Sequence, residues 1–566
     1  MQWSQNYDPL HGPLSTLAAA TPLVILLGLL ALRRVPAYAA ALAGLAMALF
    51  VAIGVIGMPG AMASRAALLG AAYGLLPIGW IVLNVMFLYR LTADRGVFIA
   101  LQRAITGITD DRRLQLLLIA FCFGAFFEGA AGFGTPVAVT GAILIGIGFP
   151  PFEASALSLI ANTAPVAFGA LGTPVVALQG VTGLDLGALS AMIGRQLPFF
   201  SFIVPFWLIA AYDGFRGLRE TWPALFVAGI SFAIPQFLVS NFHGPWLVDI
   251  VAAACSMVCL AGFLRVWQPS AKASVIPSEA RDPLPDGGAF LGEGARSPEP
   301  ALRSASDVGA PDDNPIPFRI AVVPWVILTV IVFAWGTPQL KGLLNHVSAP
   351  NIVIPGLDKM VFRVPPVLAK PTPEPAAFLF NWLSASGTAI LLTAIVSGFV
   401  LRYSVTQMIR EYALTFGMVW QSLLTIAAML ALGYTTRYSG QDAILGLAFA
   451  HTGVMYPFFA AMLGWLGVAL TGSDTSSNVL FGSLQRITAQ RLGLGPVLMA
   501  AANSSGGVMG KMIDAQSIVV ASTATRWVGH EWRILRFVFW HSIGLATLVG
   551  LLVLLQQYVF TGMIVK

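Results

Sequence analysis

The stretch EGAAGFGTP at residues 128–136 decides the fold of this chain. Strongly apolar sequence flanks it, with LLLIAFCFGAFF before it and VAVTGAILIGIG after it. The small residues and Pro136 in this stretch favour a break in the helix. Inside a bilayer every backbone polar group must find a hydrogen-bond partner, so a break there needs a structural reason. A carboxylate, Glu128, stands at this break. The combination predicts the working part of a membrane protein rather than a surface turn.

The composition agrees with a chain whose main solvent is lipid. Of the 566 residues, 57% are hydrophobic and 10% are charged, against about 25% charged residues in soluble domains. The net charge of +6 does not indicate nucleic-acid binding, because the basic residues cluster in short loops between apolar segments. The three cysteines lie in apolar segments without a histidine or a second cysteine pair, so we expect no metal site and no cofactor.

The fold class that we predict is an all-α polytopic membrane protein with about twelve transmembrane helices. Each span needs about 20 apolar residues. The expected spans lie near 16–32, 36–57, 67–90, 153–178, 188–212, 221–239, 246–267, 318–337, 376–400, 412–434, 494–521 and 536–560. Arginine-rich short loops predict an external N-terminus.

Two further segments, 114–149 and 443–492, are too long for one span and carry small or polar residues at their centres. We interpret both as re-entrant hairpins. Residues 268–317 contain nine prolines and eight acidic residues, a composition that predicts a disordered cytoplasmic linker. The linker divides the chain into two membrane halves, 1–267 and 318–566.

The second half also contains the loop 338–375, which we expect on the outer face, with short strands as one alternative. The two halves repeat one order of events: an apolar arm, a broken tip, a second arm, and a helix interrupted after an asparagine. Asn162 in ANTAPVAFG and Asn503 in ANSSGGVMG are these asparagines. The expected orientations are opposite, and inverted repeats with interrupted helices are how many secondary transporters build a site at the bilayer midplane.

Glu128 and Asp474 are the candidate proton-coupling residues. A charged side chain at the bilayer centre costs about 2.5–3.5 kcal/mol, so a carboxyl that binds and releases a proton suits the position of Glu128. Asp474 lies in TGSDTSSN (471–478), a cluster of hydroxyl and amide groups between apolar arms. The sequence leaves open whether Asp474 carries protons or coordinates a cation.

Lys511 and Asp514 are three residues apart, within reach of a salt bridge. Lys511 either binds a substrate carboxylate or only neutralises Asp514. Asp514 and Thr173 each follow the asparagine of their half by eleven residues. Arg195 is a weaker candidate for binding a substrate anion.

Together, FFEGAAGFGTPVAV (126–139), LIANTAPVAFGALGTP (159–174) and TGSDTSSNVLFG (471–482) resemble the bacterial L-lactate permease family. The resemblance covers almost the whole membrane region. It implies a multi-pass protein of the bacterial inner membrane that takes up L-lactate, and also D-lactate and glycolate, by proton symport. It further implies that the tips at 128–136 and 471–478 and the breaks after Asn162 and Asn503 form the site. The linker 268–317 is longer and more acidic than this family leads one to expect.

The candidate substrate-binding residues are Gly134, Thr135, Asn162, Thr173, Thr471, Ser473, Thr475, Ser476, Asn478, Asn503, Ser504, Lys511 and Asp514. The expected partners are a small 2-hydroxy monocarboxylate, protons and lipid, whereas the oligomeric state stays open. A channel and a membrane-embedded enzyme are the rival classes, but no channel filter, HExxH or GxSG pattern supports them. A transporter of another small anion, coupled to protons or sodium, is the closest alternative.

Overall fold

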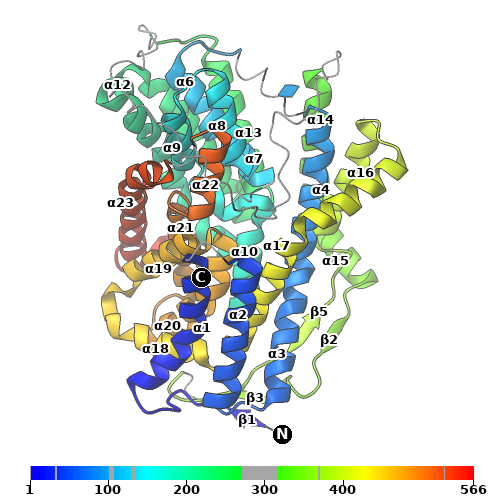
Figure 1. The fold of residues 1–566 in the computed structure, drawn as a ribbon, viewed down its shortest axis with the longest axis vertical. Helices are drawn as coiled ribbons and strands as arrows, with labels where there is room; N and C mark the ends of the chain where they lie inside the picture. The colour runs from blue at the N-terminus through cyan, green and yellow to red at the C-terminus, as the bar shows by residue number, and fades with distance from the viewer. Residues whose placement is uncertain are drawn as a thin grey trace, which may run out of the picture.

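The computed structural model describes residues 2–31, 35–97, 99–100, 103, 107–130, 132, 135–269, 317–367, 370–527 and 530–565. Most of the predicted linker, 270–316, lies outside these ranges, as does Gly134. The described residues are mainly helical, which confirms the predicted all-α class (Figure 1).

The helices before the linker are α1 (Pro13–Ala31), α2 (Ala37–Phe50), η1 (Val51–Val55), α3 (Gly60–Tyr73), η2 (Gly74–Gly79), α4 (Trp80–Asp94), α6 (Arg112–Leu116), η3 (Leu117–Phe123), α7 (Gly124–Ala130), α8 (Thr135–Gly146), α9 (Pro151–Ala161), η4 (Val166–Phe168), α10 (Gly169–Thr182), α11 (Leu186–Ile193), α12 (Leu197–Phe242) and α13 (Val248–Phe263). Those after it are α14 (Phe318–Gly336), α15 (Pro338–Val347), α16 (Ser386–Val400), α17 (Val405–Ser439), α18 (Gln441–Phe449), η6 (Ala450–Met455), α19 (Tyr456–Thr471), α20 (Asp474–Leu492), α21 (Pro496–Gly510), α22 (Ala515–Ala524), α23 (Glu531–Tyr558) and η7 (Thr561–Met563).

By length and composition, eight helical segments among the described residues can cross a membrane, or nine if the bent pair α9 and α10 is one span. The predicted number of twelve is therefore not confirmed. One reason is that α11 and α12 form a single run, Leu186–Phe242, which contains two expected spans. These are separated only by a break at Gly214, where φ is +66°. Another reason is that several apolar helices, such as α13 and α16, are shorter than a bilayer.

Five short strands gather at the end of the molecule that carries the N-terminus (Figure 1). They are β1 (Trp3–Ser4), β2 (Asn351–Val353), β3 (Val361–Arg363), β4 (Thr372–Pro373) and β5 (Ala377–Leu379). β1 pairs in parallel with β3 and β4 pairs antiparallel with β3, while β2 and β5 form a separate antiparallel pair. The strands considered for the 338–375 loop are thus present. The expected span 376–400 is wrong in its first part, because β5 pairs with β2 and α16 begins only at Ser386.

Both expected hairpins contain two helical arms among the described residues. Arg112–Ala130 forms the first arm of one hairpin, with 94% of its apolar window buried, and α8 forms the second arm. In the other hairpin, α19 ends at Thr471 and α20 begins at Asp474, with Gly472 between them at φ +73°. That backbone conformation favours glycine, so a tight turn fits this position.

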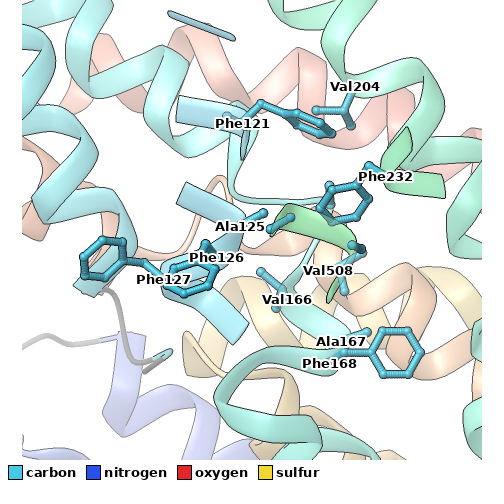
Figure 2. Packing of buried hydrophobic residues seen from close by; sticks show 14 of the residues in the cluster. Phe121, Ala125, Phe126, Phe127, Val166, Ala167, Phe168, Val204, Phe232 and Val508 are labelled. Carbon is cyan, nitrogen blue, oxygen red and sulfur yellow. The ribbon is translucent and has the colours of Figure 1, made fainter. Parts of the chain in front are cut away.

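Aromatic and aliphatic side chains hold the first broken arm against its neighbours. Phe121 of η3 packs on Phe232 of α12, with ring centroids 5.1 Å apart. Figure 2 shows this pair beside Val204 and places Ala125 of α7 near Val166 and Val508. The segment around Glu128 is therefore surrounded by helices and lies away from lipid.

Candidate functional site

A buried hydrogen-bonded network joins the second tip to α21. Asp474 is 3% exposed, and its Oδ2 accepts hydrogen bonds from Ser504 Oγ at 2.6 Å and from Asn478 Nδ2 at 3.2 Å. Asn503 Nδ2 donates to Asn478 Oδ1 at 2.9 Å. Asp474 Oδ1 has no hydrogen-bond partner among the described residues. The network thus holds one carboxylate oxygen and leaves the other available.

Asn478 also connects this network to the first half of the chain. Its Nδ2 lies 3.2 Å from the carbonyl oxygen of Pro174 in α10. That carbonyl follows the break between α9 and α10, which bend by 65°. Ala170, Leu171 and Gly172 all have positive φ there. Contact between the two halves therefore occurs where irregular backbone exposes polar groups.

The helix interruption predicted after Asn162 is confirmed by the structure. α9 ends at Ala161, and Pro165 lies in the turn that follows. Proline lacks the amide hydrogen and clashes with the preceding turn, so it favours a break or a kink at this position. The Oδ1 and Nδ2 of Asn162 are buried without a hydrogen bond of ordinary geometry among the described residues.

The corresponding interruption after Asn503 is wrong. α21 continues to Gly510, and the break falls at residues 511–514. No proline follows Asn503, and small residues instead let the helix pack closely on α19. A Cβ at Gly506 would lie 2.0 Å from the carbonyl oxygen of Ala461. The close approach requires glycine and keeps this stretch helical.

Glu128 is fully enclosed near the end of α7, with 4% of its surface exposed. Its Oε2 has no hydrogen-bond partner among the described residues. A Cβ at Gly169 would come within 2.6 Å of Glu128 Oε1, so the carboxyl group lies against the start of α10. Lys511 and Asp514 act electrostatically on Glu128, and the Asn162 amide lies beside its carboxyl group. The structure thus brings residues from both halves around this carboxyl group.

Asp249 is a second buried carboxyl group that the sequence analysis missed. It lies in the first turn of α13, is 1% exposed, and neither oxygen has a hydrogen-bond partner among the described residues. A Cβ at Gly129 would lie 2.8 Å from Asp249 Cβ, which shows how closely α7 and α13 pack. Glu128 is the charged group that acts on Asp249. The sequence feature that could have indicated Asp249 is its position as a single acidic residue inside the apolar run WLVDIVAAA.

Lys511 lies at the break between α21 and α22. Its Nζ donates to the carbonyl oxygen of Gly472 at 2.5 Å and forms an ion pair with Asp514 at 3.4 Å. Asp514 also caps α22 by accepting a hydrogen bond from the Ser517 amide. The predicted Lys511–Asp514 pair is therefore present. Lys511 further acts electrostatically on both candidate coupling residues, Glu128 and Asp474.

Most of the other predicted residues make local hydrogen bonds within their own segment. Thr173 donates to the carbonyl oxygen of Ala170 and stabilises the left-handed segment of α10. Thr471 and Ser473 make local hydrogen bonds at the second tip, and Ser476 contributes its amide to the Ser473 cap. The half-buried side chain of Thr475 makes no hydrogen bond in the described chain. Gly134 and the side chain of Thr135 lie outside the described residues.

Polar residues that the sequence analysis did not single out extend the network. Gln485 Nε2 donates to Asn503 Oδ1 at 3.1 Å, and Tyr456 donates to Gln485 Oε1 at 2.6 Å. Ser505 donates to Gln196 Oε1 at 2.6 Å. Arg195 instead hydrogen-bonds Asn241 and the carbonyl oxygen of Met563, so it anchors the C-terminal segment. Gln485 belongs to the unbroken helix α20, whereas Gln196 lies in the turn between α11 and α12.

Apolar helices long enough to cross a membrane surround a buried polar site made from broken segments. This arrangement defines a polytopic helical transporter rather than an enzyme. Residues 15–560 match the family model described as L-lactate permease. The chain belongs to the L-lactate permease family and is a multi-pass protein of the bacterial inner membrane.

Similarity to individual relatives extends over the full length. The chain is 46% identical to the glycolate permease GlcA of Escherichia coli and 43% identical to the L-lactate permease of Bacillus subtilis, covering 100% of both chains in each comparison. Among solved structures, it matches MtrF of Neisseria gonorrhoeae with a TM-score of 0.41 and 13% identity, over 86% of this chain and 83% of that one.

Proposed function

We propose that this protein takes up L-lactate, with D-lactate and glycolate as further substrates, by symport with protons. Relatives named as L-lactate permeases and as a glycolate permease support a small 2-hydroxy monocarboxylate as the substrate class. Such an anion needs a positive partner for its carboxylate and a polar partner for its hydroxyl group. The buried site contains both kinds of group.

The observation that carries proton coupling is the excess of buried acids over bases. Glu128, Asp249, Asp474 and Asp514 are all buried, and Lys511 is the only basic group among the described residues that acts on Glu128 or Asp474. An unpaired ionised carboxylate inside a membrane protein is costly, and protonation removes that cost. A site with this composition therefore favours bound protons.

Lys511 and Asp474 have separate roles in this proposal. The Lys511 ammonium group and the amides at the start of α20 attract the substrate carboxylate. Asp474, Asn478 and Ser504 offer hydrogen-bond partners to the 2-hydroxyl group. Glu128 carries the proton that travels with the anion. Binding one anion together with one proton adds no net charge to the site, which lowers the barrier to moving the substrate through the membrane.

Uptake of labelled L-lactate into proteoliposomes tests the proposal. We expect an inward proton gradient to stimulate uptake, and we expect glycolate but not succinate to compete. Uptake that responds to a sodium gradient and not to a proton gradient would contradict the assignment of the proton as the coupling ion. Competition by succinate would overturn the monocarboxylate specificity.

A further inference from the structure

The described residues line a partly open cavity of about 380 Å³ at the end of the molecule that carries the strands. Its walls come from α3, η2, α10, α17 and the segment around β5. Small-ligand sites usually begin at about 300 Å³, so the cavity has room for a small organic acid and water. Gln179, Asn381 and Arg437 are among the polar residues that line it.

Three tyrosine hydroxyls fix the walls of the cavity. Tyr434 donates to the carbonyl oxygen of Gly180, Tyr438 to that of Pro375, and Tyr73 to that of Ala377. These bonds tie α3 and α17 to α10 and to the β5 segment. The three hydroxyl groups therefore already donate hydrogen bonds within the protein, and these bonds fix the shape of the cavity independently of any ligand.

Arg437 lies on the cavity wall and does not use all of its hydrogen-bond donors. Its Nη2 donates to Glu374 at 3.1 Å and its Nη1 to the carbonyl oxygen of Val181 at 3.3 Å, while Nε has no partner among the described residues. Gln179 and Asn381 make no side-chain hydrogen bond in the described part of the chain. A guanidinium group and two amides are thus available on the cavity wall.

The charge at the cavity wall favours an anion. Arg437 lines the cavity, and its partner Glu374 is also paired with Arg363. This group of ion pairs contains two guanidinium groups and one carboxylate, which leaves one positive charge in excess. An arginine with a free donor binds a carboxylate through charge-assisted hydrogen bonds.

Helix α10 connects the cavity to the buried network, because it contributes residues to both. Pro174, whose carbonyl oxygen meets Asn478, is five residues before Gln179. At a helical rise of 1.5 Å per residue, the two positions are about 7–8 Å apart along the axis. A carboxylate bound beside Arg437 would therefore be one short step from the Asp474 network.

We propose that this cavity is a second binding site, which takes up the carboxylate of the 2-hydroxy acid before it reaches the buried network. Gln179 and Asn381 hydrogen-bond the ligand and Arg437 supplies the charge. The inference rests on the proposed function, because the anion it binds is the transported one. The strand-bearing end is the face that the distribution of arginines in the loops predicts to be external.

The test compares entry of labelled L-lactate from the two faces, in intact cells and in everted membrane vesicles. The variants are Q179L/N381L, which removes both amides without breaking an existing hydrogen bond, and N381D, which places a competing carboxylate beside Arg437. Q490L, at an exposed position on α20, is the matched control.

We expect Q179L/N381L to raise KM from one face by about 5–30-fold, the effect of losing one or two hydrogen bonds of about 1 kcal/mol each. N381D should raise the same KM further, with kcat within about twofold of wild type because the binding defect is offset by saturating substrate. Wild-type KM from both faces, or an equal rise from both faces, would overturn the cavity site. Wild-type protein that takes up no L-lactate would instead contradict the proposed function.

Discussion

Glu128 and Asp249 are two buried carboxyl groups on helices that touch at Gly129. α7 carries the first and α13 the second, and a Cβ at Gly129 would lie 2.8 Å from Asp249 Cβ. Each residue has at least one carboxylate oxygen without a hydrogen bond among the described residues. If both carboxyl groups were ionised, they would repel each other strongly in this buried region. Their proximity therefore favours a state in which at least one of them is protonated.

The first prediction concerns Glu128→Gln. Glutamine keeps the size and polarity of the side chain but cannot exchange a proton. We expect stimulation of L-lactate uptake by an inward proton gradient to be lost, while exchange of labelled for unlabelled L-lactate at equal pH persists. Both rates are measured in the same proteoliposomes. A mutant with the proton coupling of the wild type would rule out Glu128 as the proton carrier.

The second prediction concerns Asp249→Asn. If Asp249 holds a proton alongside Glu128, the substitution should lower proton-driven uptake and leave lactate exchange largely intact. A purely structural role would instead lower both rates and the amount of folded protein together. Size-exclusion profiles and exchange rates of the mutant separate these outcomes.

The third prediction concerns the bond from Ser504 to Asp474. Ser504→Ala removes a 2.6 Å hydrogen bond to a carboxylate, and bonds to charged groups contribute about 1.5–3 kcal/mol. We expect kcat/KM for L-lactate to fall by roughly 10–100-fold. Ser64→Ala is the control, because that exposed hydroxyl bonds only to the carbonyl oxygen of Gly60 in its own helix. Equal activity of the two variants would show that the network is dispensable.

The fourth prediction concerns the contact between α19 and α21. A Cβ at Gly464 would lie 1.8 Å from the carbonyl oxygen of Asn503, so Gly464→Ala must push the two helices apart. We expect a destabilisation of about 1–3 kcal/mol or more, seen as a lower thermal unfolding midpoint in detergent. Gly28→Ala, in α1 with open space around it, should leave the midpoint unchanged or raise it slightly. A wild-type midpoint for Gly464→Ala would contradict the packing described above.

The fifth prediction concerns pH and the segment between α14 and α16. Burial raises the pKa of Glu374, but Arg363, Arg437 and Arg486 outweigh this effect and hold the pKa below its ordinary value. A carboxyl group with a lowered pKa in the folded state stabilises the fold above the unfolded pKa of about 4.3, and this stabilisation is lost as pH falls through the folded pKa.

We therefore expect the segment 351–379 to become more accessible to limited proteolysis as pH falls below about 4, with a smaller dependence on pH in Glu374→Gln. An acid-stable protease should cut the wild type at low pH and spare it near neutral pH. Cleavage in this segment that is independent of pH in the wild type would contradict the assigned role of Glu374.

Much of the candidate site could be predicted because breaks in apolar sequence are visible without a structure. Glu128 and Asp474 stand at or near such breaks, and Pro165 lies in the turn that follows the end of α9. The similar segment after Asn503 has no proline, and only its packing on α19 decides that it stays helical. Sequence similarity between two asparagine motifs was therefore misleading.

Other parts depend on contacts that the sequence does not display. Asp249 opens an ordinary apolar helix and becomes notable only because α13 packs on α7. Gln485 and Gln196 likewise belong to the network because of helix packing that the sequence does not display. The number of spans could not be fixed, because bends at Gly214 and Leu76 merge or divide helices without a change in composition. The inverted relation of the two halves stays a prediction.

Proton movement measured together with lactate movement tests the central claim most directly. Proteoliposomes with a trapped pH-sensitive dye and a clamped membrane voltage receive external L-lactate, and protein-free liposomes correct for passive entry of lactic acid. We predict internal acidification with the wild-type protein and none above the protein-free rate with Glu128→Gln, although the mutant still exchanges labelled lactate. Lactate uptake by the wild type without acidification would contradict proton symport.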